Sequence, residues 1–230
     1  MKIKSPRVLG NGLFFIGLIF GFALAVIFTW NKIETVNYFF RGATPYPPFK
    51  GLSCPVMITR SEQGLVTAHF DNPADEEDNF YYRVEVSGRF EPRQIADNIT
   101  VAPHDRETVQ WLVSEKDIDL GFFIFVKAVK LPNGLHPAQE ATCGITVLDF
   151  QGLTGKQIFT TVLVFSLLGI GFGLSILQRT SHNKGPGSLL LGIVVLLGMF
   201  SGFMGWWFLG IVFIVLAILL AAIFMRNILA

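Results

Sequence analysis

Long apolar runs flank a middle segment in which apolar and polar residues alternate. Residues 13–30 form one run before it, and residues 158–177 and 188–225 form two more after it. Each run contains a span of about 20 predominantly apolar residues, the length that crosses a bilayer as an α-helix. As a single helix, the 38 residues of the last run would be roughly 57 Å long, against a hydrocarbon core of about 30 Å. We therefore expect a hairpin of two short helices there, and four transmembrane helices in all.

The bend of this hairpin is expected near Gly202, Gly205 and Trp206. Glycines cluster there, and adjacent tryptophans suit the interface between lipid and water. The predicted division of the chain is an N-terminal segment 1–11, membrane helices 12–30, 157–178, 188–203 and 207–225, a connector 31–52, a separate domain 53–150 and a loop 179–187.

The middle domain has the pattern of β-strands. Short runs rich in β-branched and aromatic residues are separated by turn signals such as Asn72-Pro73 and Ser87-Gly88. The expected strands are 56–60, 65–70, 80–86, 108–113, 121–129 and 144–148, with a short edge strand at 99–101. Short strands that follow one another without a helix-period stretch predict an all-β sandwich. The prolines between residues 45 and 48 predict that the connector before it is extended and stiff.

The distribution of charge supports this division and orients the chain. All 17 acidic residues lie between Glu34 and Asp149. Residues 31–155 carry eleven Lys and Arg, a net charge of −6, whereas the rest of the chain carries seven Lys and Arg and no acid. With four spans, the short basic segments all fall on one side, which the positive-inside rule makes cytoplasmic. The expected location is the cell membrane, with both termini cytoplasmic and residues 31–155 extracytoplasmic.

The first apolar run also has features of a cleavable signal peptide. A basic start and an apolar stretch precede Ala23-Leu24-Ala25, which has the form of an A-x-A cleavage site. The run continues to Trp30, which is longer than a usual signal core and favours an uncleaved anchor. With either interpretation the middle domain is exported.

The two cysteines, Cys54 and Cys143, lie near the two ends of the middle domain. An oxidising compartment permits a disulfide between them, and two buried free thiols are the alternative. A bridge would close a loop of roughly 90 residues, which the chain-entropy account values at about 4 kcal/mol. Its role would be structural, because the chain has no C-x-x-C pair.

Residues 102–111 carry a resemblance to a known family. A proline turn and a polar run lead into an alternating strand that ends on Trp111, and this is similar to the entry of strand E in immunoglobulin-like and fibronectin-III-like modules. The resemblance covers about residues 53–150 and implies a β-sandwich with a binding or spacing role. The Cys–Trp–Cys spacing of antibody domains is absent, so Cys54 and Cys143 would join the first strand to the last.

Candidate chemistry is sparse. The acidic residues 75–78 lack the spacing of a calcium loop and are expected to form a solvated loop, and no histidine or cysteine spacing suits a metal. We find no catalytic signature, and therefore expect no enzyme, no cofactor and no metal site. The acidic domain and the short basic segments argue against a nucleic-acid partner. Asn98 begins an N-x-T sequon on the exported side.

Small residues four positions apart form a second pattern within the apolar runs. Such faces let helix backbones approach closely, either among these four helices or with a membrane-protein partner or a second copy of the chain. The helix-packing candidates are Gly17, Gly21, Gly169, Gly173, Gly198 and Gly202.

Two functions follow from these patterns. The first is a membrane-anchored display of an extracytoplasmic β-sandwich for protein recognition or scaffolding, as in an accessory subunit of a membrane complex. The alternative is a lipid-binding or transport-linked protein with a hydrophobic pocket between the helices. Ion transport is disfavoured, because the spans contain no ionisable side chain.

Overall fold

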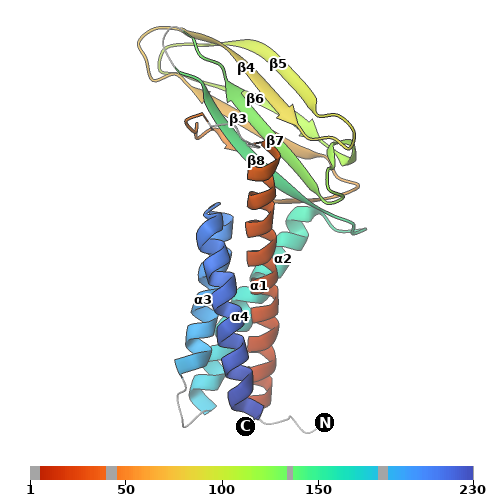
Figure 1. Ribbon diagram of the computed structural model, residues 1–230, viewed down its shortest axis with the longest axis vertical. Coiled ribbons are helices and arrows are strands. Elements are labelled where there is room, and N and C mark those ends of the chain that lie inside the picture. Colours follow the sequence, from red (N-terminus) through yellow and green to blue (C-terminus); the bar gives the residue numbers. More distant parts are fainter. Residues whose placement is uncertain (1–5, 40–45, 134–136, 181–185, 230) are drawn as a thin grey trace. The chain divides into compact units, whose positions relative to one another are not determined.

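The computed structural model describes residues 6–39, 46–133, 137–180 and 186–229, which contain four α-helices and two β-sheets (Figure 1). The chain divides into two compact units. Met1–Lys32 and Ile158–Ala230 form the helical unit, and Ile33–Gln157 form the sandwich unit. The expected succession of one helix, a middle region of strands and three further helices is therefore confirmed.

The helices are α1 (Pro6–Phe39), α2 (Gly155–Thr180), α3 (Pro186–Phe203) and α4 (Trp207–Leu229). Among the helices of the described residues, α1 from Val8 onward and α2 are long and apolar enough to cross a membrane, by length and composition. The other two are shorter apolar helices, over Gly187–Phe203 and Trp207–Ile223. The predicted bend is confirmed, because α3 ends at Phe203, α4 begins at Trp207, and Gly205 between them has a φ of 75°.

Helix α1 corrects the predicted connector 31–52. The helix continues nine residues past Trp30, to Phe39. Polar residues begin at Asn31, and they mark the end of an apolar span, but nothing between Asn31 and Phe39 breaks a helix. Of the remaining connector, residues 40–45 lie outside the described residues. Residues 47–49 run beside Glu140, whose backbone N–H donates to the Pro47 carbonyl at 3.0 Å.

Eight strands, in two sheets, lie in the described residues of the sandwich unit. The three-stranded sheet has the order β1-β3-β6, and the five-stranded sheet has the order β2-β8-β7-β4-β5. Neighbouring strands are antiparallel except β2 and β8, which are parallel. The strands are β1 (Leu52–Ser53), β2 (Met57–Thr59), β3 (Gly64–Asp71), β4 (Asp78–Val86), β5 (Arg93–Val101), β6 (Arg106–Val113), β7 (Phe123–Lys130) and β8 (Gln139–Leu148).

The strand order agrees with the expected sandwich. Strand β6, predicted as strand E, pairs with β3 along its whole length, from Gly64 opposite Val113 to Asp71 opposite Arg106. In the other sheet β7 lies between β8 and β4. A three-stranded and a five-stranded sheet that share one core make this unit a β-sandwich.

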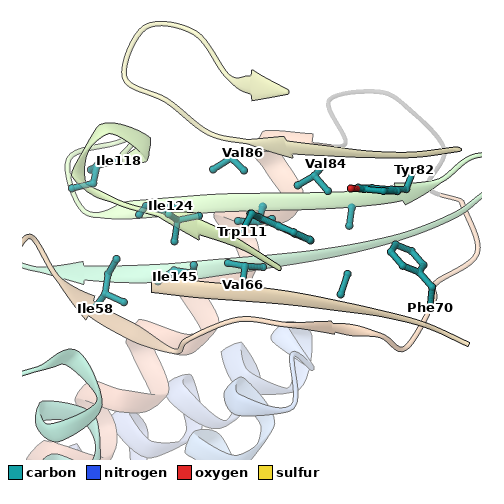
Figure 2. Close-up of a cluster of buried hydrophobic side chains, with 14 of the residues drawn as sticks. Ile58, Val66, Phe70, Tyr82, Val84, Val86, Trp111, Ile118, Ile124 and Ile145 are labelled. Carbon is teal, nitrogen blue, oxygen red and sulfur yellow. The ribbon is translucent and has the colours of Figure 1, made fainter. Parts of the chain in front are cut away.

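The sandwich core lies between the two sheets, as the close-up in Figure 2 shows. Val66 and Trp111 come from the three-stranded sheet, and Val84, Ile124 and Ile145 come from the five-stranded sheet. In β3 and β4 buried residues alternate with more exposed ones, which is the expected period of two for a sheet with one buried face.

Strand β7 departs from this alternation, because it is buried on both faces. Phe123, Phe125 and Val129 point away from the core cluster, and each is at most 2% exposed. The ring of Tyr38, in the last turn of α1, stacks on Phe125 with centroids 4.9 Å apart. The end of α1 therefore belongs to the sandwich unit and covers part of the outer face of its sheet.

Strand β5 is the edge of the five-stranded sheet and is much longer than the predicted strand at 99–101. It has nine residues and pairs with β4 from Arg93 opposite Val86 to Val101 opposite Asp78. Its first six residues are mostly polar and exposed, so no apolar alternation marks them in the sequence. An edge strand that faces solvent needs no such alternation, because its ladder hydrogen bonds to β4 hold it.

Candidate functional site

The disulfide between Cys54 and Cys143 is present, as predicted from the sequence. Cys54 lies between β1 and β2, and Cys143 lies in β8, with their Cα atoms 6.5 Å apart. It therefore joins the first strands of the sandwich to the last, next to the parallel pair β2–β8. This is a structural cross-link between the two termini of the domain.

A cleft among the described residues of the sandwich unit lies at the end where β8 runs toward α2. We call this the α2 end, and it comprises the loops 60–63, 87–92, 114–122 and 149–154. The cleft has a volume of about 1010 Å³ and is lined by residues of the first three loops. Arg60 joins these loops, because it donates to the Gly121 carbonyl and lies 3.9 Å from Glu115 and 3.6 Å from Asp149.

Local sequence fixes the start of α2 at this end. Thr154 and Gln157 form a capping box, in which each side chain accepts from the other residue's backbone N–H, at 3.2 and 2.9 Å. Gly155 leaves no room for a side chain, since an added Cβ would lie 2.3 Å from the Met57 carbonyl oxygen. Glycine at this position lets the first turn of α2 lie directly against β2.

Glu62 completes the attachment of α2 to the sandwich. One of its carboxylate oxygens accepts from the backbone N–H groups of Thr59 (2.6 Å) and Gly155 (2.7 Å) and from the Thr59 hydroxyl (2.9 Å). Burial acts to raise the pKa of this carboxyl, but the three donated hydrogen bonds outweigh burial and hold the pKa below its usual value. A carboxylate at the first N–H groups of a helix is also favoured by the helix dipole.

Large apolar side chains project from the α2 end. Phe90, in the β4–β5 loop, is 91% exposed. Leu120 is 55% exposed and has a φ of 50°, a conformation that a bulky residue rarely adopts. The exposed set also includes Phe122, Phe150 and Leu153. A leucine held outward at a positive φ is the kind of local strain that gathers at binding surfaces.

The opposite end differs in chemistry. We call it the acidic end, and it comprises the loops 72–77 and 102–105. The expected solvated acidic loop 75–78 is correct for Asp75, Glu76 and Glu77, which are exposed, but wrong for Asp78, which is 1% exposed. Asp78 accepts from the Lys130 ammonium at 2.6 Å, and its position as the first residue of β4 turns it inward.

The strands of the five-stranded sheet hold two ion pairs with buried carboxylates that the sequence analysis did not identify. Besides Asp78, Lys130 contacts an aromatic face, since its ammonium lies 3.9 Å from the ring centroid of Phe80. In the second pair Lys127 lies 2.9 Å from Glu140. Both lysines belong to β7. The alternating pattern of this strand predicts which face of the sheet each side chain lies on, but it does not predict which carboxylate pairs with each lysine. Pairing of this kind is what makes buried charges tolerable.

Each of the two described histidines forms a hydrogen bond to a neighbouring side chain. His69 bonds the Thr108 hydroxyl at 2.9 Å, and His104 bonds Asp75 at 2.8 Å. His136 and His182 lie outside the described residues. Among the residues that the structure describes, no group of three or more His, Cys, Asp or Glu could hold a metal ion. Asn98, of the sequon, is exposed on β5.

The predicted glycine faces meet one another inside the helical unit. Gly17 of α1 lies against Gly169 of α2, where a Cβ on Gly17 would come within 2.5 Å of the Ile170 backbone nitrogen. Gly173 leaves the same kind of space for Phe14, whose Cα would be 2.6 Å away. The Ser166 hydroxyl donates to the Gly17 carbonyl at 3.1 Å beside this crossing.

The other three candidates pack in the same way. A Cβ on Gly21 would lie 2.6 Å from the Ser166 hydroxyl, and one on Gly202 would lie 3.0 Å from Phe28. Gly198 has more room, with Phe213 at 3.3 Å. All six glycines therefore serve packing within the helical unit, which is one of the two interpretations that the sequence allows.

Comparisons with known proteins identify no family. No family model matches this chain, and no curated protein matches it. Among solved structures, the CARDB domain of the PF1109 protein from Pyrococcus furiosus, in complex with di-metal ions, aligns at 11% identity and a TM-score of 0.33, over 44% of this chain and 92% of that chain. A cycloisomaltooligosaccharide glucanotransferase of Paenibacillus sp. aligns at 14% identity and a TM-score of 0.34, over 44% of this chain and 14% of that chain.

A third structure is the superoxide reductase (neelaredoxin) of Ignicoccus hospitalis, at 16% identity and a TM-score of 0.33, over 42% of this chain and 78% of that chain. The aligned region thus ranges from a small part of a large enzyme to nearly the whole of a small domain. These similarities are too low to transfer an activity, a ligand or a metal to this chain.

Proposed function

We propose that this chain is a four-span membrane protein that displays its disulfide-linked sandwich outside the cytoplasm for recognition of a protein partner. The observation that carries the membrane part is the surface of the helical unit. Its outward side chains are large and apolar, for example Phe172 (60% exposed), Phe208 (66%) and Ile19 (65%). An apolar surface of this extent is unstable in water and stable in hydrocarbon.

Polar groups within the helical unit are consistent with a lipid environment. Ser175 donates to the Gly171 carbonyl at 2.8 Å, and Ser201 donates to the Leu197 carbonyl at 2.6 Å. Hydroxyls that bond to the carbonyl four residues earlier are self-sufficient and need no water. Helices α2, α3 and α4 contain no carboxylate side chain. Carboxylates are costly in hydrocarbon, so their absence fits a bilayer.

Helices α3 and α4 support four spans rather than two. Their apolar parts, Gly187–Phe203 and Trp207–Ile223, would each be about 26 Å long at 1.5 Å per residue, at the lower limit of what crosses a hydrocarbon core of about 30 Å. With four spans, the basic segments at both termini and between α2 and α3 share one side, so that side is cytoplasmic and the sandwich is extracytoplasmic.

Packing of α1 argues that this helix is an anchor that stays in the protein. Phe14 and Leu24 are each 1% exposed, and Gly17 packs on Gly169. Cleavage after Ala25 would remove these contacts and uncover the α2 face that they bury. We therefore propose an uncleaved first span.

The recognition part rests on the long edge strand β5. It pairs with β4 on one side only in the sheet order, and it contains no proline and only two charged residues, Arg93 and Asp97. Natural edge strands are usually short, or blunted by lysine and proline, because an open edge can pair with another chain. Arg93 closes one end through the Leu112 carbonyl (2.9 Å) and Asp117, which leaves residues 95–100 for strand addition by an extended segment of a partner.

Membrane topology is tested by labelling single introduced thiols in intact cells with an impermeant maleimide. The native cysteines are joined in a disulfide, so the maleimide reacts with the introduced thiol. Glu76→Cys, in the acidic end, should be labelled in intact cells, and Ser181→Cys only after lysis. Phe165→Cys, on the outward face of α2, should resist the reagent in both. Labelling of Ser181→Cys alone in intact cells would reverse the proposed orientation.

Recognition is tested with an edge variant and a matched control. The double variant Ala96→Lys and Asn98→Lys adds two charges to exposed β5 positions, and should release any protein that co-purifies with the wild-type chain in mild detergent. The control, Asp75→Lys with Glu77→Lys, adds the same residues to the acidic end and should retain the partner. A wild-type chain that purifies alone, or a partner held equally by both variants, would refute strand addition at β5.

The alternative of a lipid-handling protein receives less support. In the described part of the helical unit the cleft that we find, about 500 Å³, lies at the bend Gly205–Leu209 and not between the helices. Lipid that co-purifies with the protein and is bound between the helices would support this alternative.

A further inference from the structure

We infer that the α2 end of the sandwich is a membrane-contact surface, at which Phe90, Leu120 and their neighbours enter the headgroup layer beside the start of α2. This inference rests on the proposed membrane placement of α2. It goes beyond that placement, because it assigns one end of the sandwich, and not its edge strand, to the lipid surface.

The apolar residues of this end come from three separate loops. Phe90 lies in the β4–β5 loop, Leu120 and Phe122 precede β7, and Phe150 and Leu153 follow β8. They are between 46% and 91% exposed. Aromatic and aliphatic side chains gathered on one rim are typical of surfaces that insert shallowly at a membrane interface.

The connection of this end to α2 indicates that the surface contacts lipid. Phe150 and Leu153 lie within five residues of Gly155, where α2 begins. The Glu62 carboxylate ties Gly155 to the β2–β3 turn, and Gly155 has no space for a side chain against Met57 and Ile58. If α2 crosses the bilayer as proposed, the chain reaches the interface within a few residues of Phe150 and Leu153.

The charges at this end are compatible with headgroups. Its loops carry Arg60, Arg89 and Lys116. Arg60 faces Glu115 and Asp149, whereas the Arg89 guanidinium lies 5.8 Å from the ring centroid of Phe90. Arginine and lysine beside aromatic rings can place their stems in the apolar layer and their charges at the phosphates.

Several acidic residues of this end are already neutralised. Glu115 and Asp149 face Arg60, and Asp117 faces Arg93. Glu62 is held by three donors. Because several carboxylates of the α2 end are paired, their repulsion of anionic headgroups is weaker than the number of acidic residues suggests.

The acidic end provides an internal contrast. Its loops, 72–77 and 102–105, contain none of the exposed large apolar side chains of the described residues. They carry Asp75, Glu76, Glu77 and Asp105 instead. Of these two groups of described loops, those of the α2 end have the chemistry of a membrane contact, and this is the end at which α2 starts.

Depth-dependent quenching in proteoliposomes tests the inference on the full chain. Single variants Phe90→Cys, Leu120→Cys, Glu76→Cys and Phe165→Cys are labelled with an environment-sensitive fluorophore and reconstituted with and without lipids that carry a quencher near the headgroup. We expect labels at positions 90 and 120 to lose fluorescence when the quencher is present and to emit at shorter wavelength. The label at position 76 should be unaffected, and the label at position 165 should report the interior of the bilayer.

The four positions separate the possible failures. Absence of quenching at 90 and 120, with position 165 embedded, would overturn the contact surface and leave the membrane placement intact. Absence of quenching at 165 would overturn the placement and the surface together. Equal quenching at 76 and 90 would also overturn the inference, because contact would then not be specific to the α2 end.

Discussion

Both units of this protein have a core of buried apolar side chains, but they differ in what lies on the outside and at the closest contacts. In the sandwich unit Val66, Val84 and Ile124 are completely buried between the sheets. In the helical unit large side chains such as Phe172 lie outside, while glycines such as Gly17 and Gly169 meet inside. Water drives large apolar groups together, whereas in lipid only close packing and hydrogen bonds favour association of helices. The apolar outer surface of the helical unit is what we expect if that unit lies in lipid, as proposed above.

The largest effect is expected when a glycine at a helix contact inside the helical unit is replaced by a large residue. In Gly17→Leu the new side chain must occupy space taken by the backbone of Gly169 and Ile170, so α1 and α2 must separate. We expect a loss of stability above about 4 kcal/mol, in the exceptional range for one substitution. The measurement is the midpoint of thermal aggregation of the full chain in detergent.

Gly171→Leu is the matched control for this variant. Gly171 lies in α2, two residues after Gly169, but nothing lies within 4 Å of its would-be Cβ. We expect a change within about 0.5 kcal/mol, as for an outward position. If Gly17→Leu were as stable as Gly171→Leu, the close contact of α1 and α2 at Gly17 and Gly169 would be wrong.

Reduction of the disulfide should affect the sandwich unit and spare the helical unit. Cys54→Ala with Cys143→Ala removes a cross-link between residues 89 positions apart. We expect the sandwich to lose about 2–5 kcal/mol. Near-ultraviolet circular dichroism should show an earlier transition for the sandwich, where Trp111 is buried, whereas the far-ultraviolet helix signal should persist. Simultaneous loss of both signals would mean that the two units do not unfold independently.

The sequence predicts those features that arise from local pattern. The strands of the core, the bend at Gly205 and the pairing of two lone cysteines each follow from alternation, glycine placement or count. Trp111 is an example, because its alternating neighbours place it on the inner face of a strand without knowledge of the partner sheet.

Features that depend on distant partners could not be predicted. Asp78 belongs to a run of four acidic residues, and its burial depends on Lys130, 52 positions away. The end of α1 becomes part of the sandwich because Tyr38 meets Phe125. The rim of the α2 end gathers residues from three loops that are 30 or so positions apart, none of which is unusual by itself in the sequence.

The smallest predicted effect concerns Glu62, which attaches the sandwich to the first turn of α2. Glu62→Gln keeps the shape but removes the negative charge that accepts from Thr59 and Gly155. We expect a loss of about 1–2 kcal/mol at neutral pH, because hydrogen bonds to a charged acceptor become neutral ones.

The pH dependence of this loss has a definite sign. The pKa of Glu62 is lower in the folded protein than its ordinary value of 4.5, so the carboxylate stabilises the folded state above about that pH and ceases to do so as pH falls through the folded pKa. The difference in thermal midpoint between wild type and Glu62→Gln should therefore be constant from pH 7 to about pH 5 and shrink toward zero in more acidic buffer. A difference that is independent of pH down to the acid limit would show that the amide perturbs packing rather than charge. In that case the tie between the β2–β3 turn and α2 would rest on the close fit of Gly155 alone.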